Sequence, residues 1–202
     1  MPRIIMHWQY NTINRHHNSL YQMLERDHIN PKEYVEFYGL RAHTSFDDKA
    51  FTEIIYVHSK LMIVDDTNAI VGSANINDRS LNGARDSELA ARIKGGVAKV
   101  VRMNGKIQKV SKNIHEFRCS VFQSHFGFNH PKDVEDPLSG NFINEVRKRT
   151  KKNTQVYREI FGCYPDDNIH KISQMEPFLK KEPDLTLYKK LSPDIVGHAV
   201  EQ

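Results

Sequence analysis

The alternation of apolar and polar residues predicts strands and helices along most of this chain. Residues 57–64 alternate and then become uniformly apolar, as a strand buried on at least one face does. Four turn-forming residues follow at 65–68, and a second apolar run begins at Ala69. The two apolar runs around this turn predict a β-hairpin, and its first strand is expected to be reached through residues 54–56.

The helical period governs other stretches of the chain. Residues 2–28 predict two helices, with Asn18-Ser19 as the cap of the second. Residues 106–126 and 141–161 each predict one long helix, because apolar residues recur at core spacing in both. Two further strands are expected, at 34–40 and 87–93.

Composition describes a globular chain that can bury one sizeable core. Of the 202 residues, 39% are hydrophobic and 27% are charged, which excludes the disordered class. The simplest organisation is a single domain over residues 1–202. Within it, the polar stretch 166–202 contains several prolines and is expected to form a peripheral C-terminal segment.

Targeting signals and cysteine usage bear on the compartment. No apolar run approaches the ~20 residues that a membrane-spanning helix needs, and the first residues lack the form of a signal peptide. The two cysteines, Cys119 and Cys163, have no metal-ligand spacing. We therefore expect a reduced, cytoplasmic setting.

The charge balance of the chain is basic. A formal net charge of +4, with histidines neutral, is compatible with an anionic membrane face or with nucleic acid and selects neither. The densest charge run is at 147–152. It can be a solvated helix face or a patch for lipid headgroups or another polyanion, and both interpretations stay open.

One stretch, residues 58–75, carries the candidate chemistry. It reads H-x-K-x4-D-x6-G-S-x-N. In a strand, side chains two residues apart share a face, so His58 and Lys60 are expected to point the same way. Ser73 and Asn75 share a face by the same rule.

These side chains suit a phosphodiester substrate. A phosphoryl group in transfer carries negative charge, and fixed cations and hydrogen-bond donors aimed at it lower the barrier. Lys60 and Asn75 can hold the non-bridging oxygens, while His58 can attack phosphorus or give a proton to the leaving oxygen. No metal is needed for this chemistry, because the lysine neutralises the charge.

Carboxylates near the motif are candidates for supporting roles. Glu88 follows His58 by thirty residues and could accept the other ring N–H of that histidine, which would fix its tautomer. Asp86 is the competitor for this role. Asp65 ends the strand on the face opposite Lys60, so we expect it outside direct substrate contact, bracing the hairpin or binding a backbone donor.

The motif stretch resembles the HKD motif of the phospholipase D superfamily. Its continuation, residues 72–88, is similar to the eukaryotic phosphatidylcholine-hydrolysing branch in particular. The resemblance extends over nearly the whole chain, since four further segments are similar to the C-terminal catalytic half of that branch: 5–13, 38–43, 136–137 and 160–165.

The resemblance implies a fold and a set of roles. The fold is an α/β sandwich of the phospholipase D type, with a mixed β-sheet flanked by helices, forming one half of a pseudo-twofold bilobed enzyme. One histidine of such an enzyme forms a phosphohistidine, and His58 matches the other, which protonates the departing alcohol. No metal or cofactor is implied. The implied catalytic residues are His58, Lys60, Asp65 and Glu88, and those implied to bind phosphate are Lys60, Ser73 and Asn75.

The chain departs from this branch in carrying one HKD motif where the branch has two. We therefore expect a fragment or a partial gene product, and three hypotheses follow. The first is half of a phospholipase D site that hydrolyses phosphatidylcholine to phosphatidic acid and choline, or transfers the phosphatidyl group, once an N-terminal half completes it in cis or in trans. The second is a single-motif homodimeric phosphodiesterase or nuclease of the same superfamily. The third is an inactive fragment.

The expected partners follow from the first hypothesis. They are a phospholipid substrate at a membrane surface and the N-terminal HKD half or a homodimer mate. Nucleic acid is not expected as a partner, and the chain is expected to be peripheral on membranes in the cytoplasm.

Overall fold

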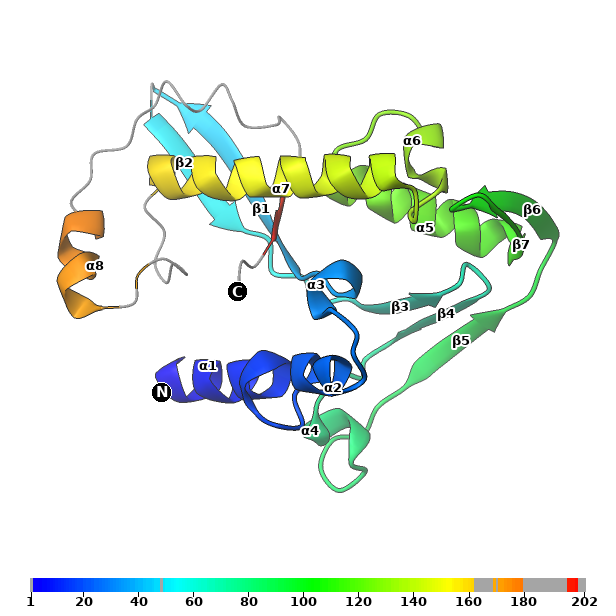
Figure 1. The fold of residues 1–202 in the computed structure, drawn as a ribbon, viewed down its shortest axis with the longest axis horizontal. Coiled ribbons are helices and arrows are strands. Elements are labelled where there is room, and N and C mark those ends of the chain that lie inside the picture. The colour runs from blue at the N-terminus through cyan, green and yellow to red at the C-terminus, as the bar shows by residue number, and fades with distance from the viewer. Residues whose placement is uncertain (1, 48, 162–168, 170, 180–195, 200–202) are drawn as a thin grey trace. The chain divides into compact units, whose positions relative to one another are not determined.

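The computed structural model describes residues 2–47, 49–161, 169, 171–179 and 196–199. It contains two compact units, Met1–Phe37 and Tyr38–Gln202, and each is described below by itself. Figure 1 labels most of the helices and strands of both.

The first unit is helical. Its elements are α1 (Pro2–Tyr10), the π-helical turn η1 (Asn11–Arg15), α2 (Leu20–Arg26) and α3 (Pro31–Tyr34). Ser19 is buried, and its hydroxyl accepts a hydrogen bond from the backbone N–H of Gln22 at 3.3 Å, so it caps α2. The expectation of two helices over residues 2–28, the second capped here, is confirmed.

The second unit contains three antiparallel sheets. The α/β class is confirmed, and every strand pair among the described residues is antiparallel. The first sheet has the order β2–β1–β8, the second β3–β4–β5, and the third is the β6–β7 hairpin. The strands are β1 (Tyr38–Phe46), β2 (Lys49–Ile54), β3 (Lys60–Val64), β4 (Asn68–Gly72), β5 (Ala90–Lys94), β6 (Ala98–Met103), β7 (Lys106–Ser111) and β8 (Val196–Ala199).

The predicted motif hairpin is present as β3 and β4. Lys60 pairs with Gly72 at one end, and Val64 pairs with Asn68 at the other. Asp65 and Asp66 form the turn with φ values of 52° and 51°, as a type I′ turn requires of both central residues. The short polar side chain of aspartate tolerates this left-handed conformation better than most residues do.

The strand expected over 54–64 is divided in the structure. Residues up to 54 pair with β1 in the first sheet, and the pairing in the second sheet begins only at Lys60. Residues 55–59 have no regular secondary structure because the chain passes there from one sheet to the next. His58 therefore precedes the motif strand, and the period-two argument that placed it beside Lys60 does not apply.

The helix expected over 106–126 is wrong in its first six residues, which form strand β7. Asn104 and Gly105, with φ values of 46° and 76°, make a tight turn that folds β7 back on β6. The helix α5 (Lys112–Phe126) begins after this strand and ends at Gly127, which has a φ of 65°. The α-helices of the second unit that remain are α4 (Asp78–Leu81), α6 (Lys132–Glu135), α7 (Gly140–Phe161) and α8 (Ile172–Leu179).

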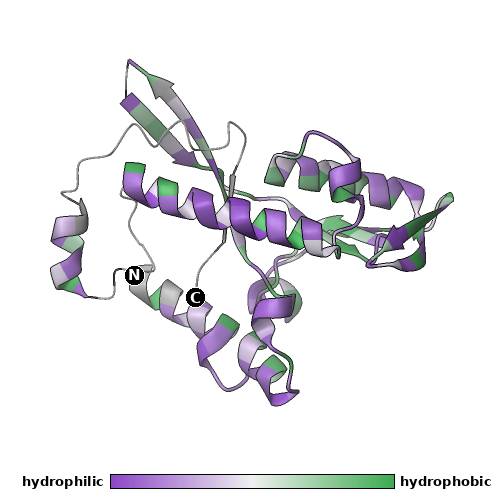
Figure 2. Ribbon diagram, turned by 45° about the horizontal axis from the view of Figure 1, so that its top comes forward, coloured by the Kyte–Doolittle hydropathy of each residue, from purple (hydrophilic) through white to green (hydrophobic). Residues whose placement is uncertain are grey.

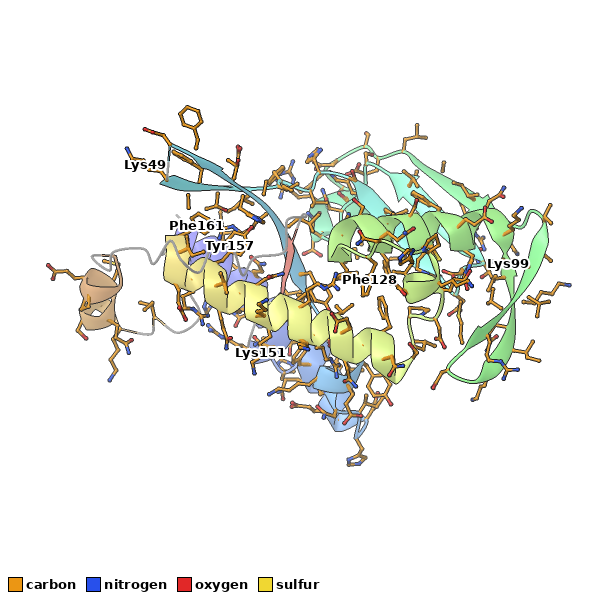
Figure 3. The ribbon with its side chains drawn as sticks, turned by 90° about the horizontal axis from the view of Figure 1, so that it is seen from above. Lys49, Lys99, Phe128, Lys151, Tyr157 and Phe161 are labelled. Atoms are coloured by element: carbon orange, nitrogen blue, oxygen red, sulfur yellow. The ribbon has the colours of Figure 1, made fainter. Side chains whose placement is uncertain are left out.

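Helix α7 matches its prediction and organises the core. Its buried residues recur at helical spacing, and Figure 2 shows the resulting alternation of hydrophobic and hydrophilic residues along it. Phe142 and Val146 pack with Cys119 of α5, and Val134 of α6 completes this cluster. Nearer the C-terminal end of α7, Tyr157 is 1% exposed, and its ring lies 5.2 Å from that of Phe161 (Figure 3).

The basic run at 147–152 has two kinds of residue in the structure. Arg149 donates hydrogen bonds to the carbonyls of Phe126 and Gly127, and its guanidinium lies 4.6 Å from the centre of the Phe128 ring. Thr150 is buried. The exposed members are Lys148, Lys151 and Lys152, so the run combines a structural arginine with a solvated lysine face.

Of the C-terminal segment expected at 166–202, the structure describes α8 and β8, together with a few residues near them. Strand β8 adds to β1 at one edge of the first sheet. The remainder of the segment, together with Cys163, lies outside the described residues, and the assignment of a peripheral segment stays a prediction.

Candidate functional site

The motif residues other than Asp65 lie at one end of the β3–β4–β5 sheet, the end opposite the Asp65-Asp66 turn. Lys60 begins β3, Gly72 ends β4 and Ala90 begins β5, and all three lie in one row of the ladder. A Cβ atom on Gly72 would lie 2.5 Å from the Leu89 carbonyl oxygen, so only glycine permits this close approach of the two strands. The backbone N–H of Ser73 donates to the same Leu89 carbonyl at 2.9 Å and extends the pairing into the site.

Glu88 accepts hydrogen bonds from two hydroxyl groups at this end of the sheet. The Ser73 hydroxyl donates to one carboxylate oxygen and the Ser80 hydroxyl to the other, both at 2.5 Å. The Ser73 oxygen in turn accepts the backbone N–H of Leu89 at 3.0 Å. Sequence reasoning placed Glu88 in the site, and the structure shows that it joins the end of β4 to α4 within the connection between β4 and β5.

Ser80 is a member of the site that sequence reasoning missed. Its hydroxyl oxygen accepts the backbone N–H of Asn75 at 3.1 Å while the same hydroxyl donates to Glu88. Ser80 is held in place by α4, whose first turn is capped when Asn77 accepts the backbone N–H of Ser80 at 3.1 Å. Asn77, directly after the motif, was the available signal, because asparagine is a preferred residue at the start of a helix.

The electrostatics of the site keep Glu88 ionised. The hydrogen bonds from Ser73 and then Ser80 lower the pKa of the Glu88 carboxyl, and the nearby charges of Lys60 and Arg79 lower it further, against a smaller raising effect of burial. Asp86, the competitor for the supporting role, forms an ion pair with Arg79 at 3.0 Å. Glu88 is therefore the carboxylate that contacts motif residues.

Lys60 and His58 are close neighbours through the backbone. The ammonium of Lys60 donates to the carbonyl oxygen of His58 at 2.5 Å. The imidazole of His58 is exposed and stacks on the ring of Tyr56, with the ring centres 5.8 Å apart. Among the described residues no hydrogen bond joins His58 to Glu88, so the tautomer-fixing role of Glu88 stays a prediction.

A cavity of about 510 Å³ lies beside Lys60 and Asn75. Ser59 and Ala74 also line it, next to the motif residues on each strand. Most of its wall is apolar, and the large apolar side chains are Leu61, Met62, Ile70, Ile76 and Leu81. The arrangement places the hydrogen-bond donors of Lys60 and Asn75 next to an apolar space that could hold a hydrocarbon chain.

The two aspartates of the turn have different surroundings. Asp65, the aspartate of the motif, is exposed at the end of β3 remote from Lys60. Asp66 is 5% exposed. It accepts a hydrogen bond from the ring of His115 at 2.8 Å and one from the guanidinium of Arg118 at 2.9 Å.

Asp66 thereby attaches the motif hairpin to α5. The carbonyl oxygen of Asp66 also accepts the backbone N–H of Ser111, at 2.9 Å. Burial raises the pKa of the Asp66 carboxyl, but the hydrogen bonds and charges of Arg118 and His115 outweigh it and hold this pKa below its usual range. Sequence reasoning missed this cluster because its members are separated by 49 and 52 residues and share no local pattern.

The described residues contain no group of three or more His, Cys, Asp or Glu side chains arranged to hold a metal ion. In the same part of the chain, no helix has both the length and the apolar composition to cross a membrane.

Comparison with known proteins assigns the family. The family model described as phospholipase D matches residues 1–170, which is most of the chain. The chain belongs to the phospholipase D family. Its site at the end of the β3–β4–β5 sheet is thus the one that carries the HKD motif of a phospholipase D.

Individual phospholipases D match over most of this chain. Phospholipase D zeta 1 of Arabidopsis thaliana is 44% identical over 174 residues, which are 83% of this chain and 16% of that protein. Phospholipase D1 of Homo sapiens is 38% identical over 181 residues, covering 88% of this chain and 17% of its own length. Phospholipase D B of Dictyostelium discoideum is 38% identical over 165 residues, which are 79% of this chain and 14% of that protein. The chain thus spans about a sixth of the length of the plant and human relatives.

Proposed function

We propose that this chain supplies one half of a phospholipase D active site, which hydrolyses phosphatidylcholine to phosphatidic acid and choline when a second HKD motif completes it. The observation that carries the proposal is the cavity of about 510 Å³, in which Lys60 and Asn75 adjoin an apolar wall. A phospholipid needs this combination because its phosphodiester is anionic and the part of the molecule beside it is apolar.

The reaction divides between two histidines. The histidine of the completing motif attacks phosphorus, and the bond from phosphorus to the choline oxygen breaks as His58 gives that oxygen a proton. Water then attacks the phosphohistidine, His58 takes the proton of that water, and the phosphorus–nitrogen bond breaks to release phosphatidic acid. An alcohol in place of water gives transphosphatidylation. Lys60 stabilises the negative charge on the non-bridging oxygens in both steps.

The hydrogen bonds of the site refine the role of Ser73. A serine hydroxyl has a single proton to donate, and the proton of Ser73 goes to Glu88. Ser73 can therefore donate to a phosphate only if this bond opens. Lys60 and Asn75 are the better candidates for direct phosphate contacts, with Ser73 and Glu88 holding the loop on which Asn75 lies.

The lining of the cavity favours a lipid over nucleic acid. Proteins that hold single-stranded nucleic acid stack its bases on aromatic side chains. The residues around this cavity include no aromatic side chain, and five of them are large and apolar. The expected association with a membrane surface, as a peripheral protein, follows from this choice of substrate.

The other half can be a second copy of the chain, which is the alternative of a single-motif homodimeric phosphodiesterase. The large apolar residues of the motif sheet are between 37% and 49% exposed, which is expected whether an N-terminal half or a second copy covers them. They are Met62, Val64 and Ile70 on one face of the sheet, and Leu61, Val71 and Ile93 on the other. Such a surface is typical of a protein that has a partner.

Choline release from phosphatidylcholine tests the proposal when it is measured beside the mass of the protein in solution. The monomer alone should release little or no choline, because it lacks the histidine that attacks phosphorus and therefore has no covalent route. Addition of an N-terminal phospholipase D half with the first motif should restore turnover. His58→Asn should abolish that rescue, whereas His16→Asn, at an exposed histidine of the first unit, should leave it unchanged. Rapid release from a strict monomer would overturn the half-site.

A further inference from the structure

The β6–β7 hairpin and its flanks hold a concentration of positive charge. Residues 94–112 contain six lysines and arginines and no aspartate or glutamate, although the net charge of the whole chain is only +4. Lys99 forms an ion pair with Glu135 at 3.6 Å, and a guanidinium nitrogen of Arg102 donates to the carbonyl of Gly105 at 3.0 Å. The other four cations form no ion pair within the described part of the chain: Lys94, Lys106, Lys109 and Lys112.

The register of the hairpin sorts its side chains onto two faces. Residues directly opposite each other in an antiparallel pair point to the same side. Val100 lies opposite Lys109, and Arg102 lies opposite Ile107, so these four residues share one face, here called the outer face. The other face carries Met103 and Val110, which are 9% and 4% exposed, and is the face that joins the protein core.

The outer face is apolar and cationic at once. Val100 and Ile107 are each 70% exposed, and Val97, just before β6, is 69% exposed. Arg102 and Lys109 lie beside them and are exposed as well. Val100 is therefore paired across the hairpin with Lys109, and Ile107 with Arg102, and all four side chains are exposed.

This composition matches the interface of an anionic bilayer. Apolar side chains gain free energy by leaving water for the boundary of the acyl chains, while neighbouring lysines and arginines are attracted to anionic headgroups. A nucleic acid would interact with the cations of this face but not with its apolar side chains. Residues 94–112 contain no Phe, Tyr, Trp or His on which a base could stack, and the exposed valines and isoleucine would stay in water.

The two flanks of the hairpin are hydrogen-bonded to each other close to the end of β5. The Ser111 hydroxyl donates to the Gly95 carbonyl at 2.5 Å, and the Lys112 N–H donates to the Val97 carbonyl at 2.8 Å. Figure 1 shows β5 leading from the α4 loop to this hairpin. Lys94 pairs with Asn68 beside the turn, so the hairpin lies at the end of the sheet away from the phosphate-binding residues.

We propose that the outer face of the β6–β7 hairpin is a membrane-binding surface that docks on anionic phospholipid bilayers. Its cations bind headgroup phosphates or carboxylates, and Val97, Val100 and Ile107 insert at the boundary of the acyl region. Because it is separate from the phosphate-binding residues, it raises the amount of protein at the membrane and takes no part in the chemistry. The proposal adds to the proposed lipid substrate, but it is tested by binding alone, so either can fail without the other.

Co-sedimentation of the purified protein with vesicles tests this surface. The vesicles are phosphatidylcholine alone, or phosphatidylcholine with about one third phosphatidylserine, which supplies the anionic surface. Wild-type protein should prefer the anionic vesicles and dissociate as salt is added. Removal of two cations by Arg102→Gln with Lys109→Gln should weaken binding about 25-fold, because each contributes about five-fold.

The apolar contribution needs its own variant. Val100→Ser with Ile107→Ser leaves every charge in place and should weaken binding to anionic vesicles on the order of ten-fold. Matched controls change the same chemistry at other exposed positions and should bind as the wild type does. They are Lys148→Gln with Lys151→Gln on α7, and Leu138→Ser with Ile172→Ser.

A reporter inside the hairpin removes any doubt about folding. Trp8 is the single tryptophan of the chain, so Ile107→Trp in a Trp8→Phe background places the only tryptophan on the outer face. Its emission should shift to shorter wavelength with anionic vesicles and stay unchanged with phosphatidylcholine alone. A tryptophan introduced by Ile172→Trp in the same background should show no shift.

Several results would overturn the membrane-binding surface. They are the absence of vesicle binding by the wild type, equal binding by all variants, or equal losses in the matched controls. If the charge variant loses a single-stranded oligonucleotide but keeps the vesicles, the surface binds nucleic acid instead. If the apolar variant changes only the mass of the protein in solution, the surface is a contact between copies of the chain.

Discussion

Two carboxylates hold the motif region together, and they do so in opposite surroundings. Asp66 is buried at the turn of the motif hairpin between His115 and Arg118. Glu88 is accessible at the other end of the same sheet and accepts hydrogen bonds from Ser73 and Ser80. Cations balance the buried carboxylate, whereas hydroxyl groups organise the accessible one.

The difference reflects what each end of the sheet must do. A buried carboxylate without a paired cation is strongly unfavourable, so Asp66 requires Arg118 and is committed to structure. Glu88 remains close to water and to Lys60, where a phosphodiester could approach. The β3–β4 hairpin is thus fixed by buried contacts at its turn and remains accessible to solvent at its other end. The motif can therefore be rigid while the site stays open to a substrate.

The largest expected effect comes from breaking the buried end. Asp66→Asn removes the charge that balances Arg118 and should lower the free energy of unfolding by about 3–5 kcal/mol, measured by urea denaturation. Asp65→Asn is the matched control, since Asp65 is the exposed neighbour in the same turn, and should change stability by less than about 0.5 kcal/mol. Equal losses of unfolding free energy in the two variants would show that the stability depends on the turn and not on the cluster of Asp66, His115 and Arg118.

This contrast also separates what the sequence could predict from what it could not. The motif hairpin and helix α7 were predictable because their apolar periods are local and unambiguous. Strand β7 was not, because Ile107, Val110 and Ile114 fit a helical period and the Asn104-Gly105 turn before them was overlooked. A short apolar run permits both interpretations until its turn residues are weighed.

The candidate site shows the same limit. Lys60, Ser73 and Asn75 belong to or directly follow the two strands of one predicted hairpin, so their presence at the same end of a sheet could be predicted. The three residues of the buried cluster come from a turn and a helix far apart in the chain, and only packing brings them together. The bonds of Glu88 to Ser73 and Ser80 depend on loop conformation, which residue spacing does not specify.

A smaller effect is expected from the accessible end. Ser80→Ala removes the hydroxyl that bridges Glu88 and the backbone of Asn75. It should lower the free energy of unfolding by less than Asp66→Asn does, because water can replace the lost hydrogen bonds. The pKa of Glu88 should rise toward its ordinary value, because one of the two hydrogen bonds that lower it is lost. Titration of the Glu88 carboxyl by NMR measures this change. Ser87→Ala, at the exposed residue beside Glu88, should leave the pKa of Glu88 unchanged.

The smallest expected effect is the pH dependence of the stability that Asp66 contributes at the buried end of the sheet. The pKa of Asp66 in the folded protein lies below its ordinary value of 3.8, so the unfolded chain binds a proton there before the folded protein does. The stability contributed by Asp66 is therefore fully present above the unfolded pKa and is lost as the pH falls toward the folded one. For this single group, the free energy of unfolding should fall by at most about 1.4 kcal/mol per pH unit. Asp66→Asn has no proton to gain at this position, so its stability should depend less on pH below about 4 than that of the wild type does. Parallel curves for the two proteins would show that the cluster does not hold Asp66 ionised.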